Sequence, residues 1–536
     1  MCRPPSNQTA RDMLGPVLAA DTTISQIQPA PSIPPQRIYQ VDLSDGRSLH
    51  LVLPPLSLWR PLRFEQGMVA SEAAAVRWIA SQQSSSSSSQ SHSSSTSTST
   101  FTACLPEPPE PDDPDSPSYP FFSLLPTLLH HGQEKSNLLG SSFAVYSPTP
   151  AQVRSVPLAL LLLPPSPGPR SASAPAPLSQ RERHRLDRQT GALFRHLAGL
   201  TSPSGRFGPL AAVVGSHLPP RNPLNPGLLA RPGAGVGGVA GGSGSGNGGP
   251  GGGGGGGLMT TTGGAGTWSV AFHAMLEGIL RDGEDMAVVL GYSTIRRIFR
   301  RLGYLLDEVR TARLVVVEGG GNVMVEVDER KGEGEEGGDG TGKGEEQGLA
   351  SKEGEEDKKQ EEVKRETGGG EHESWEGETK GGEKGEANPL RNLNVTGLRD
   401  WSSCVFGDPL LATVFSDPQQ QPPSAGFLEG FNGKKPQQKL DAADIKHIPL
   451  NRDIIEAVDT AWIRLLLYQA YHSVVHIVSE FYRPRPDSST RELEARRKLN
   501  EVLARLAEVA DDAKRRHQRP SGEMSPAKRI KAEPED

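Results

Sequence analysis

Long segments that are too poor in apolar side chains to form a core interrupt this sequence, and they limit how much of it can fold. Only 35% of the 536 residues are hydrophobic, and 61 glycines and 47 prolines punctuate the chain. Such segments cannot bury enough apolar surface to offset the entropy cost of ordering. About 300 residues remain, which is a typical size for one domain. We therefore expect disordered segments at residues 1–35, 81–118, 164–177, 216–266, 329–388, 416–445 and 511–536.

Cysteine content and hydropathy narrow the cellular setting. The three cysteines, Cys2, Cys104 and Cys404, are too scattered for a disulfide framework or a metal cluster, which favours a reducing compartment. The longest apolar stretch, Val156–Pro165, is too short to cross a bilayer, and the N-terminus lacks the apolar core of a signal peptide. The mild net charge of −7 gives no reason to expect a nucleic acid partner. We expect an intracellular protein without a membrane partner.

Residues 37–55 carry the clearest strand pattern in the sequence. Apolar side chains alternate up to Leu43, the turn residues Asp45 and Gly46 follow, and the alternation resumes from Leu49. An Asp-Gly pair between two alternating runs is a strong hairpin signal. The sequence therefore predicts an antiparallel hairpin here.

Helical spacing of apolar residues returns at several places after this hairpin. Ser71–Ile79 has the spacing of an amphipathic helix, and Ser179 with Glu182 forms a capping box that opens another. In the last predicted helix, Leu493, Leu499, Val502, Leu503 and Leu506 are expected to face inward. The last predicted helix spans residues 492–510, and the others are at residues 267–280, 293–309 and 463–483.

Two further runs are predicted to be the arms of a second hairpin. Val323–Val327 alternates, and so does Leu393–Leu398, with the segment 329–388 between them. The pairing would bring Asn322, before the first arm, close to Asp400, after the second. Oxygen donors of this kind are ligands that hold Mg²⁺ against a phosphate.

The stretch Gly397-Leu398-Arg399-Asp400-Trp401, followed by Gly407-Asp408-Pro409, resembles a segment of the aminoglycoside phosphotransferase and choline kinase-like family, in particular its fungal branch. The resemblance extends over six further blocks in the expected order: 37–55, 62–79, 119–147, 178–209, 267–325 and 462–484. It implies an α+β protein-kinase-like fold with two lobes around an ATP cleft. The small antiparallel sheet lobe would span residues 36–147, and the larger helical lobe would span residues 148–510.

The same resemblance implies a site for phosphoryl transfer from ATP to a hydroxyl of a small molecule. Asn322 and Asp400 would hold Mg²⁺, and Glu318 would be the candidate catalytic base. Glu72 lies where a helix of the small lobe would present a carboxylate to a phosphate-binding lysine. It is therefore the candidate cofactor-binding residue.

The sequence departs from the family pattern at two positions. Val52 stands where the phosphate-binding lysine is expected, and Val317 stands at the position of the catalytic aspartate. Arg47, Arg60 and Arg63 are candidate substitutes for the lysine, or they are solvated surface arginines. Glu318 replaces the aspartate if the loop is one residue shorter. Otherwise the segment is a glycine turn between strands, and Glu318 is solvated.

These departures leave a second function open. In this alternative the protein is a catalytically inactive pseudokinase, an interaction module whose inserts or tail bind protein partners. The tail has two basic clusters between residues 514 and 531, of the kind that directs nuclear import. The alternative for the tail is a solvated segment, so the sequence leaves a nuclear and a cytoplasmic location open.

Overall fold

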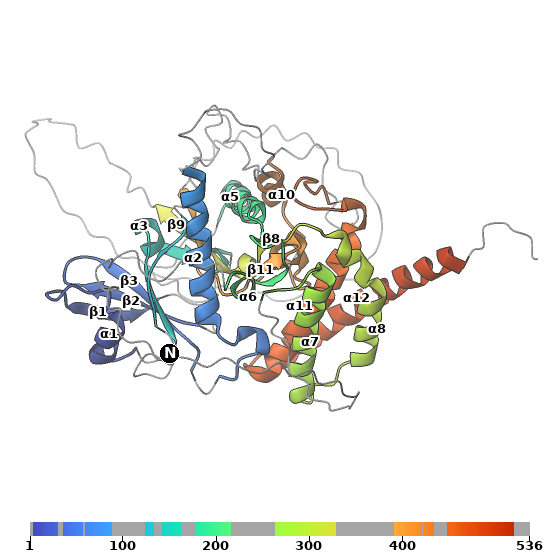
Figure 1. Ribbon diagram of the computed structural model, residues 1–536, viewed down its shortest axis with the longest axis horizontal. Helices are drawn as coiled ribbons and strands as arrows, with labels where there is room; N and C mark the ends of the chain where they lie inside the picture. Colours follow the sequence, from blue (N-terminus) through green and yellow to red (C-terminus); the bar gives the residue numbers. More distant parts are fainter. Residues whose placement is uncertain are drawn as a thin grey trace, which may run out of the picture. The chain divides into compact units, whose positions relative to one another are not determined.

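The computed structural model describes ten stretches of the chain (Figure 1). The predicted inserts 164–177 and 329–388 lie wholly outside the described residues, as do most of 81–118 and 216–266 and the tail after residue 518. Apart from positions 328, 391 and 392, the described residues belong to one compact unit. The described stretches are 4–30, 36–56, 59–87, 124–132, 142–162, 178–215, 263–328, 391–420, 422–433 and 448–518.

The fold is mixed α+β with antiparallel sheets, as the sequence predicted, and its largest described sheet has five strands. The order is β1-β2-β3-β5-β4. The predicted hairpin is confirmed as β2 and β3, with Tyr39 opposite Leu51 and with Gly46 at φ +83° in the turn. The strands are β1 (Ile24–Pro29), β2 (Arg37–Leu43), β3 (Ser48–Leu53), β4 (Thr127–Gly132) and β5 (Phe143–Ser147).

The prediction that residues 1–35 form a disordered lead-in is wrong for much of that segment. Helix α1 (Asn7–Leu14) begins at the N-cap Ser6, and strand β1 extends the sheet (Figure 1). Met13 and Leu14 of α1 pack on the sheet face that carries Tyr39, Val41 and Leu51. A short apolar stripe suffices here because the sheet already supplies the surface against which it packs.

Helix α2 (Met68–Ser87) connects β3 to β4 and packs on the opposite face of the sheet. This face contributes Ile38, Val52 and Tyr146 to the main core. The larger described helices that follow are α5 (Gln180–Gly199), α7 (Trp268–Asp285), α8 (Tyr292–Leu302), α10 (Ala425–Asn432), α11 (Val458–Tyr482) and α12 (Ser488–Gln518). The short ones are α3 (Pro150–Val153), α4 (Leu158–Leu161), α6 (Leu210–Val214) and α9 (Thr413–Ser416).

Several helix predictions are confirmed and some of their details change. The capping box of Ser179 and Glu182 opens α5. The predicted helix 293–309 is shorter, because α8 ends at Leu302 and a 3₁₀ turn follows over Gly303–Glu308. Leu493 was expected to face inward but is 70% exposed, since Ala495, Leu499, Val502 and Leu506 form the buried stripe of α12. Helix α12 also extends past residue 510 into the predicted tail.

The predicted disordered insert 416–445 contains a core helix. Phe427, Leu428 and Phe431 of α10 are buried. Its Gly430 lies so close to α5 that an added Cβ would be 1.9 Å from the carbonyl oxygen of Arg188. Only glycine allows helices to approach so closely, so Gly430 is needed for the packing of α10 against α5. Residues 434–447 lie outside the described part.

The described residues also form two three-stranded sheets, and the first of them positions Asn322 and Asp400. The first has the order β10-β9-β6, which confirms the predicted hairpin of β9 and β10. The second has the order β7-β11-β8, with Val405 of β11 opposite Val315 of β8. The strands are β6 (Ser155–Pro157), β7 (Gly208–Pro209), β8 (Arg313–Val316), β9 (Val323–Asp328), β10 (Asn392–Leu398) and β11 (Cys404–Gly407).

A buried ion pair joins β11 to α11. Arg464 Nε donates to Asp408 Oδ2 at 2.9 Å, and the exposed fractions of the two side chains are 0% and 1%. The hydroxyl of Tyr468 donates to the same oxygen at 2.9 Å and accepts from Trp268 Nε1 at 2.7 Å. The backbone N–H of Leu410 donates to Asp408 Oδ1 at 3.1 Å. Hydrogen bonds therefore accompany the ion pair, which buried charges require.

The described helices include none with the length and apolar character needed to cross a membrane.

Candidate functional site

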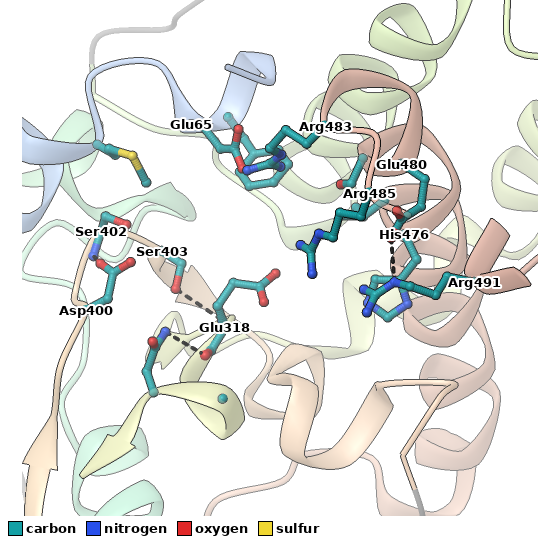
Figure 2. A pocket seen from close by; sticks show the side chains of 16 residues that line it. Glu65, Glu318, Asp400, Ser402, Ser403, His476, Glu480, Arg483, Arg485 and Arg491 are labelled. Atoms are coloured by element: carbon teal, nitrogen blue, oxygen red, sulfur yellow. Dashed lines mark hydrogen bonds and ion pairs between the residues drawn. The ribbon is translucent and has the colours of Figure 1, made fainter. Parts of the chain in front are cut away.

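Three residues that the sequence singled out, Glu318, Asn322 and Asp400, line one pocket (Figure 2). The pocket has a volume of about 230 Å³. Its other walls come from the residues before α2 and from the junction of α11 and α12. The remaining lining residues used below are Glu65, Ser402, Ser403, His476, Glu480, Arg483, Arg485 and Arg491.

The hairpin of β9 and β10 brings Asn322 and Asp400 together. The backbone N–H of Arg399 donates to the carbonyl of Asn322 at 2.9 Å, so the two chain segments are joined where they enter the pocket. Asn322 ends the 3₁₀ turn Gly319–Asn322, and Asp400 follows directly after β10. The predicted convergence of these two residues is therefore present.

Both side chains are held by further hydrogen bonds. Asn322 Nδ2 donates to the carbonyl of Glu318 at 2.9 Å, and Asn322 Oδ1 accepts from Arg399 Nη2 at 3.0 Å. Asp400 Oδ1 accepts from the backbone N–H of Ser402 at 2.7 Å and from Gln36 Nε2 at 3.4 Å. Burial raises the pKa of Asp400, while Ser402 and the Arg399 guanidinium oppose this shift. The site is thus preorganised before any ligand binds.

Glu318 stands at the head of the glycine turn, with its side chain exposed to the pocket. Its backbone N–H donates to Ser403 Oγ at 3.1 Å. The turn needs glycine because a Cβ at Gly319 would lie 2.5 Å from the Phe194 ring, and one at Gly320 would lie 2.9 Å from Val414. This turn fixes the backbone from which Glu318 projects. The alternative of a solvated turn residue agrees with the structure, because the segment is a glycine turn between β8 and β9 and Glu318 is exposed. Its side chain also lines the pocket.

The surrounding protein raises the pKa of Glu318 to about 7. The first cause is the loss of hydration deep in the pocket, and the second is repulsion from Asp417, Glu65 and Asp400. Arg483 acts in the opposite direction. A carboxylate with a pKa near neutrality can both accept and release a proton, which is what a general base requires.

The raised pKa of Glu318 predicts a pH dependence of stability. The native state keeps the proton above the ordinary carboxyl pKa of 4.5, so Glu318 contributes stability below that pH and loses it as pH rises to about 7. We expect Glu318→Gln to melt at an increasingly higher temperature than the wild type between these two pH values. Thermal melts in a pH series measure this difference. Glu494→Gln, on the exposed face of α12, is the control, and a pH-independent difference for Glu318→Gln would refute the shift.

Glu72 lies on α2 and is 2% exposed. Burial and the charge of Asp400 raise its pKa well above the usual range, whereas hydrogen bonds from Gln36 and the backbone of Trp401 oppose the shift. Val52, at the expected lysine position on β3, is 3% exposed and belongs to the apolar core. The structure thus brings Glu72 toward Asp400, without a lysine between them.

The three arginines that were candidate substitutes for this lysine have other roles. Arg47 pairs with Asp45 in the hairpin turn, at 2.8 Å. Arg63 pairs with Asp282 at 2.6 Å, and the Arg60 guanidinium lies 5.2 Å from the centroid of the Tyr482 ring. None of the three lines the pocket that contains Glu318, Asn322 and Asp400, so the structure does not bring them to the candidate site.

The cation that sequence reasoning missed is Arg399. Burial lowers its pKa, and the charges of Asp400 and Glu72 oppose this effect. It also lines a smaller apolar pocket of about 70 Å³, together with Ile38, Val52 and Leu398. The only sequence signal for Arg399 is its position directly before Asp400. Strand alternation alone does not predict on which face of the sheet its side chain lies.

The oxygen atoms of Asn322 and Asp400 are of the type that Mg²⁺ binds. Asn322 Oδ1 accepts one hydrogen bond from Arg399, and a carbonyl oxygen has a second lone pair. The donor set therefore fits a hard cation, but Arg399 lies beside it and competes for the same negative charge. Within the described residues, no cluster of three or more His, Cys, Asp or Glu side chains has the arrangement of a metal site.

Comparisons with known proteins do not place the chain in a family. No protein-family model matches the sequence, and no curated protein is significantly similar to it.

Proposed function

We propose that this protein is a phosphotransferase of the aminoglycoside phosphotransferase and choline kinase type, which transfers the γ-phosphate of ATP to a hydroxyl of a small molecule. The observation that carries the proposal is the meeting of Glu318, Asn322 and Asp400 in one pocket. These three residue types in one cleft can supply a base and a metal-binding pair.

The arrangement of the elements supports a kinase-like, two-lobed fold. A five-stranded antiparallel sheet with α2 precedes a larger helical part, as the resemblance implies. In protein kinases the phosphate-binding lysine is on the third strand, and its glutamate partner is on the following helix. Here Val52 is on β3 and Glu72 is on α2, and this order of elements supports the proposal even though the lysine is replaced.

The proposed reaction assigns a role to each side chain. The small apolar pocket between Ile38, Val52 and Leu398 would take the adenine ring, and Arg399 at its edge would face the phosphates. The acceptor hydroxyl oxygen bonds to the γ-phosphorus, the bond from that phosphorus to the β,γ-bridging oxygen breaks, and ADP leaves. Glu318 takes the hydroxyl proton. Mg²⁺ on Asn322 and Asp400 would neutralise the charge of the phosphates.

A second candidate function is a pseudokinase that acts as an interaction module. It is favoured by the hydrogen bond from Arg399 to Asn322 Oδ1, because this bond occupies one lone pair of an oxygen to which the metal would bind. The buried side chains of Val52 and Val317 favour it as well. In this case the inserts and the basic tail would carry protein contacts, and the family's chemistry would be lost.

Binding of Mg-ATP distinguishes the two candidates. A ligand that binds only the native state at 100 times its Kd stabilises it by about 2.7 kcal/mol. We expect the wild type to melt a few degrees higher in millimolar Mg-ATP, and Asp400→Ala to lose this shift because the phosphates lose their metal. Asp307→Ala, an exposed aspartate outside the pocket, should keep it. A wild type that does not respond to Mg-ATP would eliminate the phosphotransferase.

A further inference from the structure

Four of the seven Asp, Glu and Arg side chains that line the pocket form two ion pairs with one another. Arg483 Nη2 lies 2.7 Å from Glu65 Oε1, and Arg491 Nε lies 2.7 Å from Glu480 Oε1. Glu480 also accepts from the hydroxyl of Ser488 at 2.5 Å. The second pair joins α12 to α11, and the first joins the end of α11 to the 3₁₀ turn Arg63–Glu65. Within each pair the two charges cancel in the pocket wall.

Arg485 is the lining arginine whose guanidinium has no ion pair or hydrogen bond among the described residues. Figure 2 shows its side chain directed into the same space that the Glu318 carboxylate faces. The backbone N–H of Arg485 donates to Ser488 Oγ at 2.6 Å, which fixes the start of the side chain. Pro484 and Pro486 flank it and restrict its backbone further.

The carboxylates of the pocket offer an ammonium group of the acceptor only one free partner, because the proposed reaction assigns Asp400 to Mg²⁺. Glu65 and Glu480 are already paired with arginines, and Asp400 accepts hydrogen bonds from Ser402 and Gln36. Only Glu318 remains, and the proposed reaction needs it to take a proton. An amino sugar would bring its ammonium groups close to the unpaired guanidinium of Arg485, and the two would repel each other.

We propose that the acceptor bound in this pocket carries an anionic group, a carboxylate or a phosphate, and that Arg485 binds it while Glu318 faces the acceptor hydroxyl. The inference rests on the proposed phosphotransferase function and specifies its substrate class. The planar guanidinium forms paired hydrogen bonds with either anion, so a hydroxy acid and a sugar phosphate share the chemistry that Arg485 recognises.

Binding of small probes without nucleotide tests this inference. The anionic probes are glycerate, with a carboxylate, and glycerol 3-phosphate. Glycerol and glucosamine are the neutral and cationic counterparts. Isothermal titration should detect at least one anionic probe at millimolar concentration, and the one that binds identifies the anion. Glycerol and glucosamine should bind more weakly. Arg485→Gln should weaken the anionic probe by roughly 10- to 100-fold, because a hydrogen bond to a charged group contributes about 1.5–3 kcal/mol.

The variants separate a binding role from a structural one. Arg485→Lys should retain part of the affinity, and Arg181→Gln, an exposed arginine on α5 outside the pocket, should leave it unchanged. The inference is overturned if neither anionic probe binds, if glucosamine or glycerol binds equally well, or if Arg485→Gln has no effect. A normal response to Mg-ATP in the same preparation would then show that only the substrate class is wrong, and not the phosphotransferase itself.

Discussion

Replacing Asp408 by alanine is expected to destabilise the protein by about 3–5 kcal/mol, because Arg464 would lose its buried counter-ion and keep only Glu308, which is partly exposed and lies 3.7 Å from Nη1. The Arg464 side chain is 0% exposed, so water cannot reach its guanidinium. The hydroxyl of Tyr468 would lose its acceptor in the same position. A loss of this size is a large fraction of the stability of most domains, so chemical denaturation should show partial or complete unfolding at low denaturant.

A double variant tests whether the buried charge is the cause. Asp408→Leu combined with Arg464→Met removes both charges, and it should recover part of the stability that Asp408→Ala loses. If Asp408→Ala alone changes the unfolding free energy by less than about 1 kcal/mol, the ion pair does not have the solvent-excluded character described above.

The second large effect is expected for catalysis. If the protein is a phosphotransferase, Glu318→Gln should reduce turnover by about 10²–10⁴-fold, because the amide cannot take the hydroxyl proton. The variant keeps the shape of the side chain, so the response to Mg-ATP should be unchanged. Release of ADP in the presence of an acceptor measures turnover, and Glu494→Gln is again the control.

An unchanged rate in Glu318→Gln would remove Glu318 from the mechanism while leaving nucleotide binding open. The comparison with Asp400→Ala is informative here. The aspartate variant should lose both the Mg-ATP response and turnover, whereas the glutamine variant should lose turnover alone. The two residues would then have distinct roles in one pocket.

Much of the strand framework could be predicted from the sequence because alternation and turn chemistry act locally. The Asp45-Gly46 turn and the apolar alternation on both sides were sufficient for β2 and β3. The pairing of β9 with β10 was also predictable, although many residues separate the two strands, because each arm alternates and ends in a polar residue. This pairing placed Asn322 and Asp400 correctly.

What could not be predicted depends on tertiary packing. Glycines near Gly430 resemble those of a linker until α5 is placed against them. Helix α1 is short, and only the sheet beneath it explains its order. Arg485 is surrounded in sequence by residues that give no hint of a pocket, and the position of Arg399 before Asp400 does not show where its side chain lies. The environment of each arginine depends on which ion pairs the neighbouring charged residues form, and local sequence spacing does not predict those pairs.

The two ends of the β9–β10 hairpin differ in how much change in the sequence they tolerate. At its pocket end, a backbone and a side-chain hydrogen bond join Arg399 to Asn322, and a one-residue slip of the ladder would turn both side chains away. At its other end the chain continues into residues 329–390, and doubling the length of a connection costs only about 0.6 kcal/mol. An insertion in that connection should therefore cost little stability, since the ladder itself fixes the residues at the pocket end.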